Sequence, residues 1–324
     1  MPEILPRLLE SIEAARTFCV VGHVRPDGDC IGSQLALARG LKAVGRKVCV
    51  WNADPLPAKL AFLDPEGWLA PPEPGRRFDC VIATDAASLD RLGTVAEHVG
   101  RRRTLINIDH HESNTRFGDL NWVETASPST GELIHRLYRA AGWPVSPAAA
   151  DCLFTAISTD TGSFQYPSVR PETFETAAAL VREGADLAAI CRRVYQSQTL
   201  ARVKLLRHVY RTFRLSRDGR VAWFWLRPAD LTRAGADRSD TEGLIEHVRA
   251  LESVVVACLF EQTETGAVRI SLRSKDPAVD VNRVAGAFGG GGHPAAAGAR
   301  LEGPPATVQR CVLSALRKAL HSPA

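Results

Sequence analysis

The sequence predicts an α/β protein in which a mostly parallel sheet, covered by helices, is joined through a helical linker to a smaller α/β domain. In the first half, short apolar runs alternate with segments of helical spacing, which is typical of a parallel sheet. A charged stretch of helical spacing then fills residues 188–213. A chain of 324 residues also favours two domains over one. We therefore expect a first domain over 1–187, a linker over 188–213 and a second domain over 214–324.

The elements expected in the first domain follow from the spacing of its apolar residues. Residues 4–15 and 30–44 have apolar side chains at helical intervals, and Gly45 marks the end of the second helix. Four short apolar runs indicate strands, at residues 17–22, 47–51, 78–84 and 104–108. The alternation of these runs with helices is what predicts parallel strand pairing.

Helical spacing resumes from residue 127 to about residue 183, with interruptions at 142–144 and 162–171. Beyond residue 216 the second domain begins, with strands expected at 221–226, 254–260 and 268–272 and helices at 241–251 and 304–320. Residues 286–298 are rich in glycine, and we expect them to form a loop.

Composition places the chain among globular proteins. Apolar residues make up 45% and charged residues 23%, so a sizeable core is expected and extensive disorder is not. The net charge of +4 is compatible with an anionic substrate but is too small to indicate a general nucleic-acid coat. No apolar stretch reaches the roughly 18 residues of a membrane span, and the N-terminus lacks the features of a secretory signal. We therefore expect a soluble protein without a membrane partner.

The eight cysteines indicate the compartment. They are scattered singly, form no C-x-x-C pair, and mostly lie in apolar runs. Such cysteines are typical of core positions in proteins of a reducing compartment. The cytoplasm is therefore the expected location.

The first candidate site lies directly after the first predicted strand, in Gly22-His23-Val24-Arg25-Pro26-Asp27-Gly28-Asp29. It places the imidazole of His23 and the carboxylates of Asp27 and Asp29 within seven residues. The proline and glycine between them permit a sharp turn that directs both carboxylates to one place. An equally weighted interpretation is an ordinary turn whose aspartates cap the next helix, with Asp29 well placed as the N-cap.

Three more segments carry polar side chains just past predicted elements. Asp85 follows a buried strand, the triplet Asp109-His110-His111 follows the next one, and Asp160 ends a helical run. Taken singly, Asp85 is explained as the start of a turn and Asp160 as a polar helix terminus. Two histidines beside an aspartate are harder to explain without a functional site.

The predicted fold joins these segments. Ligands of open α/β sheets bind outside the carboxyl ends of the strands, so these side chains should gather along one edge. Five carboxylates and three imidazoles in one pocket need counter-charge, because like charges raise the pKa values of the carboxyl groups. Two divalent cations would supply it. An oxygen-rich set with imidazoles and no thiolate suits Mn²⁺ or Mg²⁺ best and leaves Zn²⁺ and Fe²⁺ open.

The four segments, in this order, resemble the DHH phosphoesterase superfamily, which is named for the triplet that stands here at residues 109–111. The resemblance covers nearly the whole chain. It implies that one metal ion is held by His23, Asp27 and Asp85. It implies that a second ion is held by Asp29, Asp85, His110 and Asp160.

The same resemblance implies three catalytic roles. Asp85 would be shared by both ions, His111 would face the substrate phosphate, and Asp109 would orient a neighbouring histidine. A water activated between the ions would attack phosphorus in line with the leaving ribose oxygen.

The second domain offers a glycine run followed by His293 and a strand-end arginine, Arg273. Glycines let phosphate approach backbone N–H groups closely, and a guanidinium can fork onto phosphate. The alternative is a flexible surface loop beside a solvated basic strand.

This pairing resembles the DHH-associated C-terminal domain, which binds the nucleotide part of the substrate. The resemblance implies substrate contacts for Gly290, Gly291, Gly292, His293 and Arg273. Arg249 resembles a substrate-side arginine of the family, and a solvated helix face explains it equally well. The family loop usually continues with a cation, whereas residues 294–298 here read Pro-Ala-Ala-Ala-Gly, so a detailed substrate preference does not carry over.

In length and domain order the chain resembles the compact nano-RNase and pAp phosphatase group of the superfamily. This implies a metal-dependent hydrolase that cleaves short oligonucleotides to mononucleotides, or pAp to AMP, with Mn²⁺ favoured and a homodimer compatible. A soluble phosphodiesterase of linear or cyclic dinucleotides, such as pApA or c-di-AMP, is the close alternative. A non-catalytic nucleotide-binding protein is less favoured, because none of the metal ligands is missing.

Overall fold

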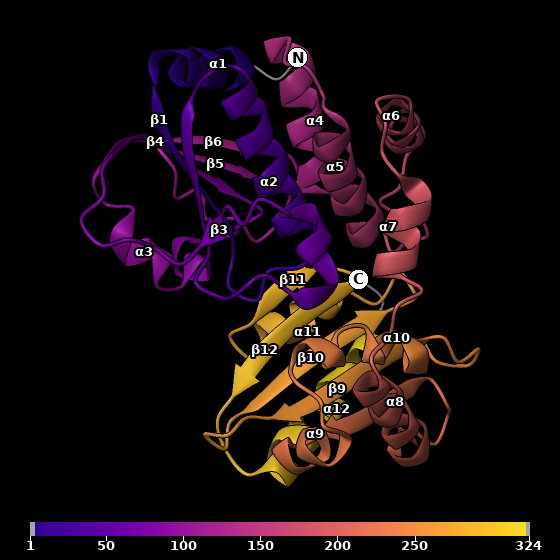
Figure 1. Ribbon diagram of the computed structural model, residues 1–324. Coiled ribbons are helices and arrows are strands. Elements are labelled where there is room, and N and C mark those ends of the chain that lie inside the picture. Colours follow the sequence, from indigo (N-terminus) through magenta and orange to yellow (C-terminus); the bar gives the residue numbers. More distant parts are fainter. Residues whose placement is uncertain (1–3, 322–324) are drawn as a thin grey trace. The chain divides into compact units, whose positions relative to one another are not determined.

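The computed structural model describes residues 4–321, which form two compact units (Figure 1). The first unit ends at Ser197 and the second begins at Gln198, so the division falls inside the predicted linker. Among the described residues, no helix is long and apolar enough to cross a bilayer.

The helical linker predicted over 188–213 consists of two helices and not of one continuous helix. Helices α7 (Leu187–Val194) and α8 (Leu200–Thr212) are separate, and the hydroxyl of Thr199 accepts a hydrogen bond from the amide of Arg202 at the start of α8. Ile190 of α7 packs into the core of the first unit, whereas Leu205 of α8 packs into a core of the second. The stretch divides because its two halves bury their apolar residues in different cores.

The first unit contains a six-stranded sheet whose strand pairs are all parallel, which confirms the predicted fold class. Its order is β3 (Leu69–Ala70), β2 (Lys47–Trp51), β1 (Thr17–Val21), β4 (Phe78–Thr84), β5 (Arg102–Asp109) and β6 (Leu120–Val123). The edge strands β3 and β6 were not predicted from the sequence. They have two and four residues, too few to show a period.

Helices cover both faces of this sheet (Figure 1). One face packs against α1 (Ile4–Ala14), α2 (Gly28–Ala43), α4 (Thr130–Ala141) and α5 (Pro147–Asp160), with α6 (Pro171–Arg182) beside α5. The other face carries the short α3 (Val95–His98) and a 3₁₀ turn, Leu89–Leu92. Helix α2 is buried along most of its length, which fixes the residues at its N-terminus firmly.

The second unit contains a smaller mixed sheet in the order β11 (Gly291–His293), β12 (Ala296–Leu301), β10 (Val268–Ser274), β9 (Val256–Gln262), β8 (Val221–Leu226) and β7 (Arg214–Leu215). Only the β8–β9 pair is parallel. Helices α11 (Val281–Gly286) and α12 (Pro305–His321) pack on one face. Helices α8, α9 (Pro228–Ala234) and α10 (Leu244–Arg249) pack on the other.

The predicted glycine loop is partly wrong, because β11 and β12 form a hairpin across it. A Cβ atom added at Gly290 would lie 2.1 Å from the carbonyl oxygen of Gly298, and one at Gly292 would lie 2.4 Å from that of Ala296. The glycines therefore permit close strand approach, a use that apolar periodicity does not reveal.

Candidate metal centre and substrate residues

The parallel sheet brings the candidate residues of the first unit to one edge. β1 ends just before His23, β4 ends directly before Asp85, and β5 ends with Asp109 itself. Because these neighbouring strands are parallel, their carboxyl ends lie on the same side. Helix α2 begins there with Asp29 in its first turn, and α5 ends there with Asp160.

Asp85 is buried and lies between two histidines. Its Oδ2 atom is 3.3 Å from Nε2 of His23, and its Oδ1 atom is 3.6 Å from Nε2 of His110. The hydroxyl of Thr130 donates a hydrogen bond to the same Oδ1 atom at 3.0 Å. Each carboxylate oxygen therefore faces a different imidazole, which is the arrangement that a ligand shared by two ions needs.

The backbone of Asp85 is strained. Its φ angle is 57°, in the left-handed region that non-glycine residues adopt at a cost of about 1–3 kcal/mol. Its amide donates a hydrogen bond to the carbonyl oxygen of Ile108 at 3.0 Å, which holds this conformation against the neighbouring strand. The strain turns the chain sharply where the carboxylate leaves the sheet.

His23 is oriented by its own loop. Its Nδ1 atom lies 2.9 Å from the carbonyl oxygen of Val24 and 3.2 Å from Nη2 of Arg91, so Nε2 is left to face the carboxylates. That Nε2 atom lies 3.8 Å from Oδ1 of Asp27. The same Asp27 oxygen accepts a hydrogen bond from the amide of Cys30 at 3.1 Å and caps α2. The N-cap is therefore Asp27, and the alternative that assigned this role to Asp29 is wrong.

His110 is surrounded by three carboxylates. Its Nε2 atom lies 3.2 Å from Asp160, 3.6 Å from Asp85 and 3.7 Å from Asp29. Its Nδ1 atom is 3.2 Å from the carbonyl oxygen of Ser127, which directs Nε2 toward the acidic side chains. The structure thus brings together the residues that the sequence assigned to the second metal ion.

The N-terminus of α4 supports Asp29. The amides of Thr130 and Gly131 donate hydrogen bonds to its two carboxylate oxygens at 2.7 and 2.8 Å, and the hydroxyl of Ser33 donates at 3.1 Å. Ser129 caps this helix, since its hydroxyl accepts a hydrogen bond from the amide of Glu132 at 3.2 Å. The sequence did not reveal the contacts of Thr130 and Ser33, because Thr130 lies 101 residues from Asp29.

The crowding of negative charge fits divalent cations. Burial and the charges of Asp85, Asp160 and Asp27 raise the pKa of Asp29 well above its usual value. Burial also raises the pKa of Asp160 to about 6, although the imidazole of His110 opposes the rise. Ligand atoms of Asp29, Asp85 and His110 all lie within 4.8 Å of one another. Such oxygen and imidazole donors suit hard or borderline divalent metals.

Cys30 is a neighbour that the sequence did not assign to the site. Its Sγ atom lies within 4.8 Å of ligand atoms of His23 and Asp85, in a second group able to hold a metal ion. A single cysteine at the start of a helix resembles an ordinary core residue, so its sequence context gave no signal.

His111 is held by Asp109. Its Nδ1 atom lies 2.8 Å from Oδ1 of Asp109, which is fully buried, and the side-chain amide of Asn114 donates to Oδ2 of that carboxylate at 2.6 Å. Burial lowers the pKa of His111, but the hydrogen bond and charge of Asp109 outweigh it and raise the pKa to about 9. Asp109 therefore fixes the orientation of the imidazole through Nδ1. Asn114 was not anticipated from the sequence.

In the second unit, Glu246 joins the two predicted substrate arginines. Its Oε1 atom is 3.1 Å from Nε of Arg273, and its Oε2 atom is 2.6 Å from Nε of Arg249. Both guanidinium groups are partly exposed. The pairing shows that Arg249 belongs to the same cluster as Arg273 and is not an isolated solvated side chain.

The hairpin places His293 level with Arg273. Arg273 pairs with Ala296 across β10 and β12, and Ala296 pairs with His293 across β12 and β11. Residues directly opposite each other across antiparallel strands share a face of the sheet, so the two side chains lie on one face, two strand spacings or about 10 Å apart at the backbone.

Comparisons with known proteins agree with this architecture. Residues 17–157 match the family described as DHH family, N-terminal domain, and residues 221–321 match the DHHA1 domain. The chain is 34% identical over 305 residues to the bifunctional oligoribonuclease and PAP phosphatase NrnA of Thermus thermophilus, covering 93% of this chain and 88% of that protein. It is 28% identical over 299 residues to the Bacillus subtilis protein of the same name, covering 91% and 92%.

Two solved structures are similar in fold. An exopolyphosphatase-related protein from Bacteroides fragilis gives a TM-score of 0.88 at 26% identity, covering 98% of this chain and 96% of that one. RecJ from Thermus thermophilus, in complex with Mn²⁺, gives 0.55 at 16% identity, covering all of this chain and 56% of that one. The chain belongs to the DHH family of metal-dependent phosphoesterases, in which a DHH domain is followed by a DHHA1 domain.

Proposed function

We propose that this protein hydrolyses short oligoribonucleotides to mononucleotides and pAp to AMP. The observation that carries the proposal is the position of Asp85, one carboxylate oxygen of which faces His23 and the other His110. The names of the Thermus and Bacillus relatives support the substrate class, because both are called oligoribonuclease and PAP phosphatase.

We infer a pair of divalent cations, with Mn²⁺ favoured over Mg²⁺ by the share of imidazole ligands. His23, Asp27 and Asp85 would hold one, and Asp29, Asp85, His110 and Asp160 would hold the other. When bound, such a pair supplies an activated water and stabilises negative charge on the phosphoryl oxygens.

Two residues of the chain would act on the phosphate directly or through a neighbour. His111, whose pKa is raised to about 9, would donate from Nε2 to a phosphoryl oxygen and stabilise the charge that grows there. Asp109 would keep the imidazole in this orientation, since it occupies Nδ1 at 2.8 Å. Asn114 in turn fixes Asp109.

The second unit would bind the nucleotide. Arg273 and His293, level on one face of the sheet, would contact its phosphates, and the backbone of Gly290, Gly291 and Gly292 would allow close approach. Arg249 would contribute through the cluster that Glu246 organises. On this view Glu246 holds both guanidinium groups in place before substrate binds.

The test is hydrolysis of pAp, pApA and cyclic di-AMP by the purified protein with and without Mn²⁺. We expect AMP from pAp and from pApA, only when metal is present. Binding of these compounds without any product would instead support the non-catalytic alternative. Faster cleavage of the cyclic than of the linear dinucleotide would support the cyclic-dinucleotide alternative.

The proposal also covers location and assembly. The eight cysteines are free, and five of them are buried, which supports a reducing compartment such as the cytoplasm. A homodimer is compatible with the proposal, and the mass of the protein in solution, measured by light scattering, tests it.

A further inference from the structure

The amino ends of four adjacent strands of the first sheet, β2, β1, β4 and β5, carry a concentration of cations. We call the following nine residues the basic row: Arg16, Lys42, Arg46, Lys47, Arg76, Arg77, Arg101, Arg102 and Arg103. Because the strands are parallel, this edge is opposite the carboxyl edge that holds Asp85. β4 spans seven residues, so about 20 Å separates the two edges.

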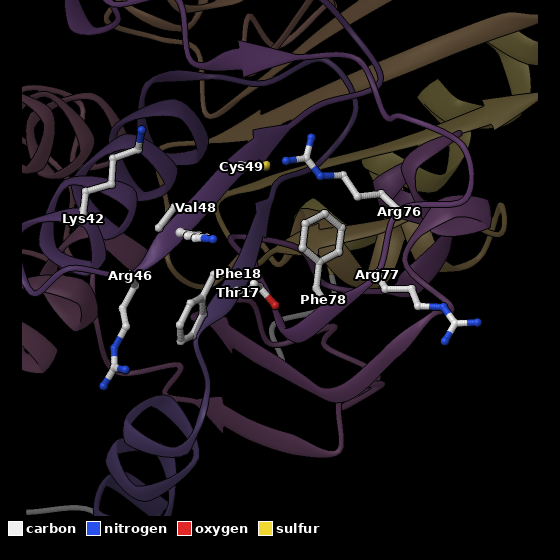
Figure 2. A pocket seen from close by; sticks show the side chains of 10 residues that line it. Thr17, Phe18, Lys42, Arg46, Val48, Cys49, Arg76, Arg77 and Phe78 are labelled. Atoms are coloured by element: carbon white, nitrogen blue, oxygen red, sulfur yellow. The ribbon is translucent and has the colours of Figure 1, made fainter.

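A hollow of about 320 Å³ lies within the basic row (Figure 2). Figure 2 shows two phenyl rings between cationic side chains, with Lys42 and Arg46 on one side of Phe18 and Phe78 and with Arg76 and Arg77 on the other. Lys47 also lines the hollow, and none of its ten lining residues is acidic. The hollow is therefore bordered by cationic residues and has apolar side chains between them.

Few carboxylates neutralise this edge. In the described chain they include Glu13, Glu66, Glu73, Asp79, Glu97 and Asp119. Asp79 is occupied by the amides of Arg16 and Thr17 at 3.0 Å. Glu73 pairs with Arg76 at 2.8 Å, an exposed contact that contributes little in solvent.

Several members of the row are available to a ligand. Within residues 4–321, the side chains of Lys47, Arg77 and Arg101 form neither an ion pair nor a hydrogen bond, and all three are exposed. The nine cationic residues of the basic row carry more positive charge than the net +4 of the whole chain. The net charge of the chain does not reveal this local concentration of cations, because acidic residues elsewhere in the chain compensate for them.

We propose that the basic row binds the phosphate backbone of single-stranded RNA, at a surface separate from the metal centre. Four strands at about 4.8 Å spacing extend the row over about 14 Å, which suits an elongated polyanion. Phe18 and Phe78 are buried, so the row has no aromatic platform for bases and should bind without sequence preference. Among residues 42–49, Val44 is the one large apolar side chain that is exposed, which is too little to insert into a lipid surface and favours RNA over a membrane.

The basic row would hold longer RNA at the surface of the protein. Phosphates of one strand are about 3.4 Å apart, so a strand of about four or more nucleotides can span the row, whereas a dinucleotide fills only part of it. The proposal does not depend on the reaction catalysed at the opposite edge. Loss of the row should therefore change RNA retention and leave dinucleotide turnover intact.

The experiment compares the Mn²⁺-loaded full chain with Lys47→Glu/Arg77→Glu and with a control of equal charge change, Arg182→Glu/Arg192→Glu, on the exposed surfaces of α6 and α7. The probe is a fluorescein-labelled, nuclease-resistant phosphorothioate 12-mer, followed by anisotropy from 50 to 300 mM KCl. We expect the row variant to bind at least about tenfold more weakly at 50 mM KCl. The slope of the logarithm of the binding constant against the logarithm of the KCl concentration should be shallower by about 1.4, or about 0.7 for each lost phosphate contact.

The control variant should bind within about twofold of the unmodified chain, and both variants should keep its melting temperature and its kcat/KM on pApA. Equal weakening by the two variants would overturn the proposal. Full displacement of the probe by 1 mM AMP would show a small-phosphate site instead. Retention on phosphatidylglycerol vesicles without RNA binding would show a lipid surface. Absence of pApA hydrolysis in the unmodified chain would contradict the proposed function and leave the RNA comparison interpretable.

Discussion

At the scale of single residues, the site is organised around Asp85. It is buried, its backbone is strained, and its two carboxylate oxygens face different histidines. Asp109 is also buried, but its contacts are to His111 and Asn114, so it supports a neighbour and does not face both histidines. The two aspartates should therefore differ in what their loss does.

We predict that Asp85→Asn lowers kcat more than Asp109→Asn does. Loss of a residue that orients a ligand typically costs about 10–100-fold, which is the range expected for Asp109. Loss of a carboxylate shared by both ions should exceed it. Steady-state kinetics on pApA, with circular dichroism to confirm folding, measures both, and equal or reversed losses would count against the shared ligand.

Much of the site was predictable at this scale, because carboxylates and imidazoles directly after predicted strands can be recognised in the sequence as candidate metal ligands. His23, Asp85 and His110 meet as expected. Thr130 and Asn114 were not anticipated, since hydroxyls and amides are common in loops and their roles depend on tertiary contacts. The helix cap was assigned to the wrong aspartate because both stand within one turn of the helix start.

At the scale of elements, the N-terminus of α4 has to approach α5 and Asp29 closely. A Cβ atom added at Gly131 would lie 2.5 Å from Cβ of Ala156 and 3.3 Å from Oδ1 of Asp29. Gly131 therefore allows the helix amides to reach that carboxylate. The geometry of the candidate metal centre depends on this packing as well as on the side chains that would hold the ions.

We predict that Gly131→Ala reduces both stability and kcat. Overpacking of this kind costs about 1–3 kcal/mol, and better helix propensity offsets about 1 kcal/mol of it. Gly100→Ala is the matched control, because a Cβ atom there meets nothing within 4 Å. Urea unfolding and kcat on pApA measure the effects. An unchanged kcat in a destabilised Gly131 variant would show that catalysis does not depend on the position of α4.

Elements were predictable where they were long and periodic. The central strands β1, β2 and β4 and the helices α4 and α5 appear where apolar spacing placed them. The linker and the glycine hairpin were not predictable in detail. The linker divides according to which core each half enters, and the hairpin forms from glycines that lack an apolar period.

At the scale of the whole molecule, the two units contain different parts of the chemistry. The acidic and imidazole cluster belongs to the first unit, and Arg273, Arg249 and His293 belong to the second. Substrate affinity and metal content should therefore respond to substitutions in different units.

We predict that Arg273→Ala weakens binding of pApA by about 1.5–3 kcal/mol, the usual worth of a charged hydrogen bond, and leaves metal content unchanged. Arg269→Ala is the matched control, because Arg269 lies on the same face of β10 and also pairs with a glutamate, Glu261. KM measured for both variants, with metal counted by mass spectrometry, tests this. A rise in KM of equal size for both would indicate a general effect of charge.

The central claim is that a pair of divalent metal ions at the carboxyl edge of the first sheet drives phosphoester hydrolysis, and metal removal tests it most directly. The measurement is pApA turnover after EDTA treatment and dialysis, followed by titration with Mn²⁺ while bound metal is counted. We expect no turnover in the metal-free protein and full recovery as occupancy approaches two ions per chain, because the crowded carboxylates need that counter-charge. Full turnover in metal-free buffer would contradict the account.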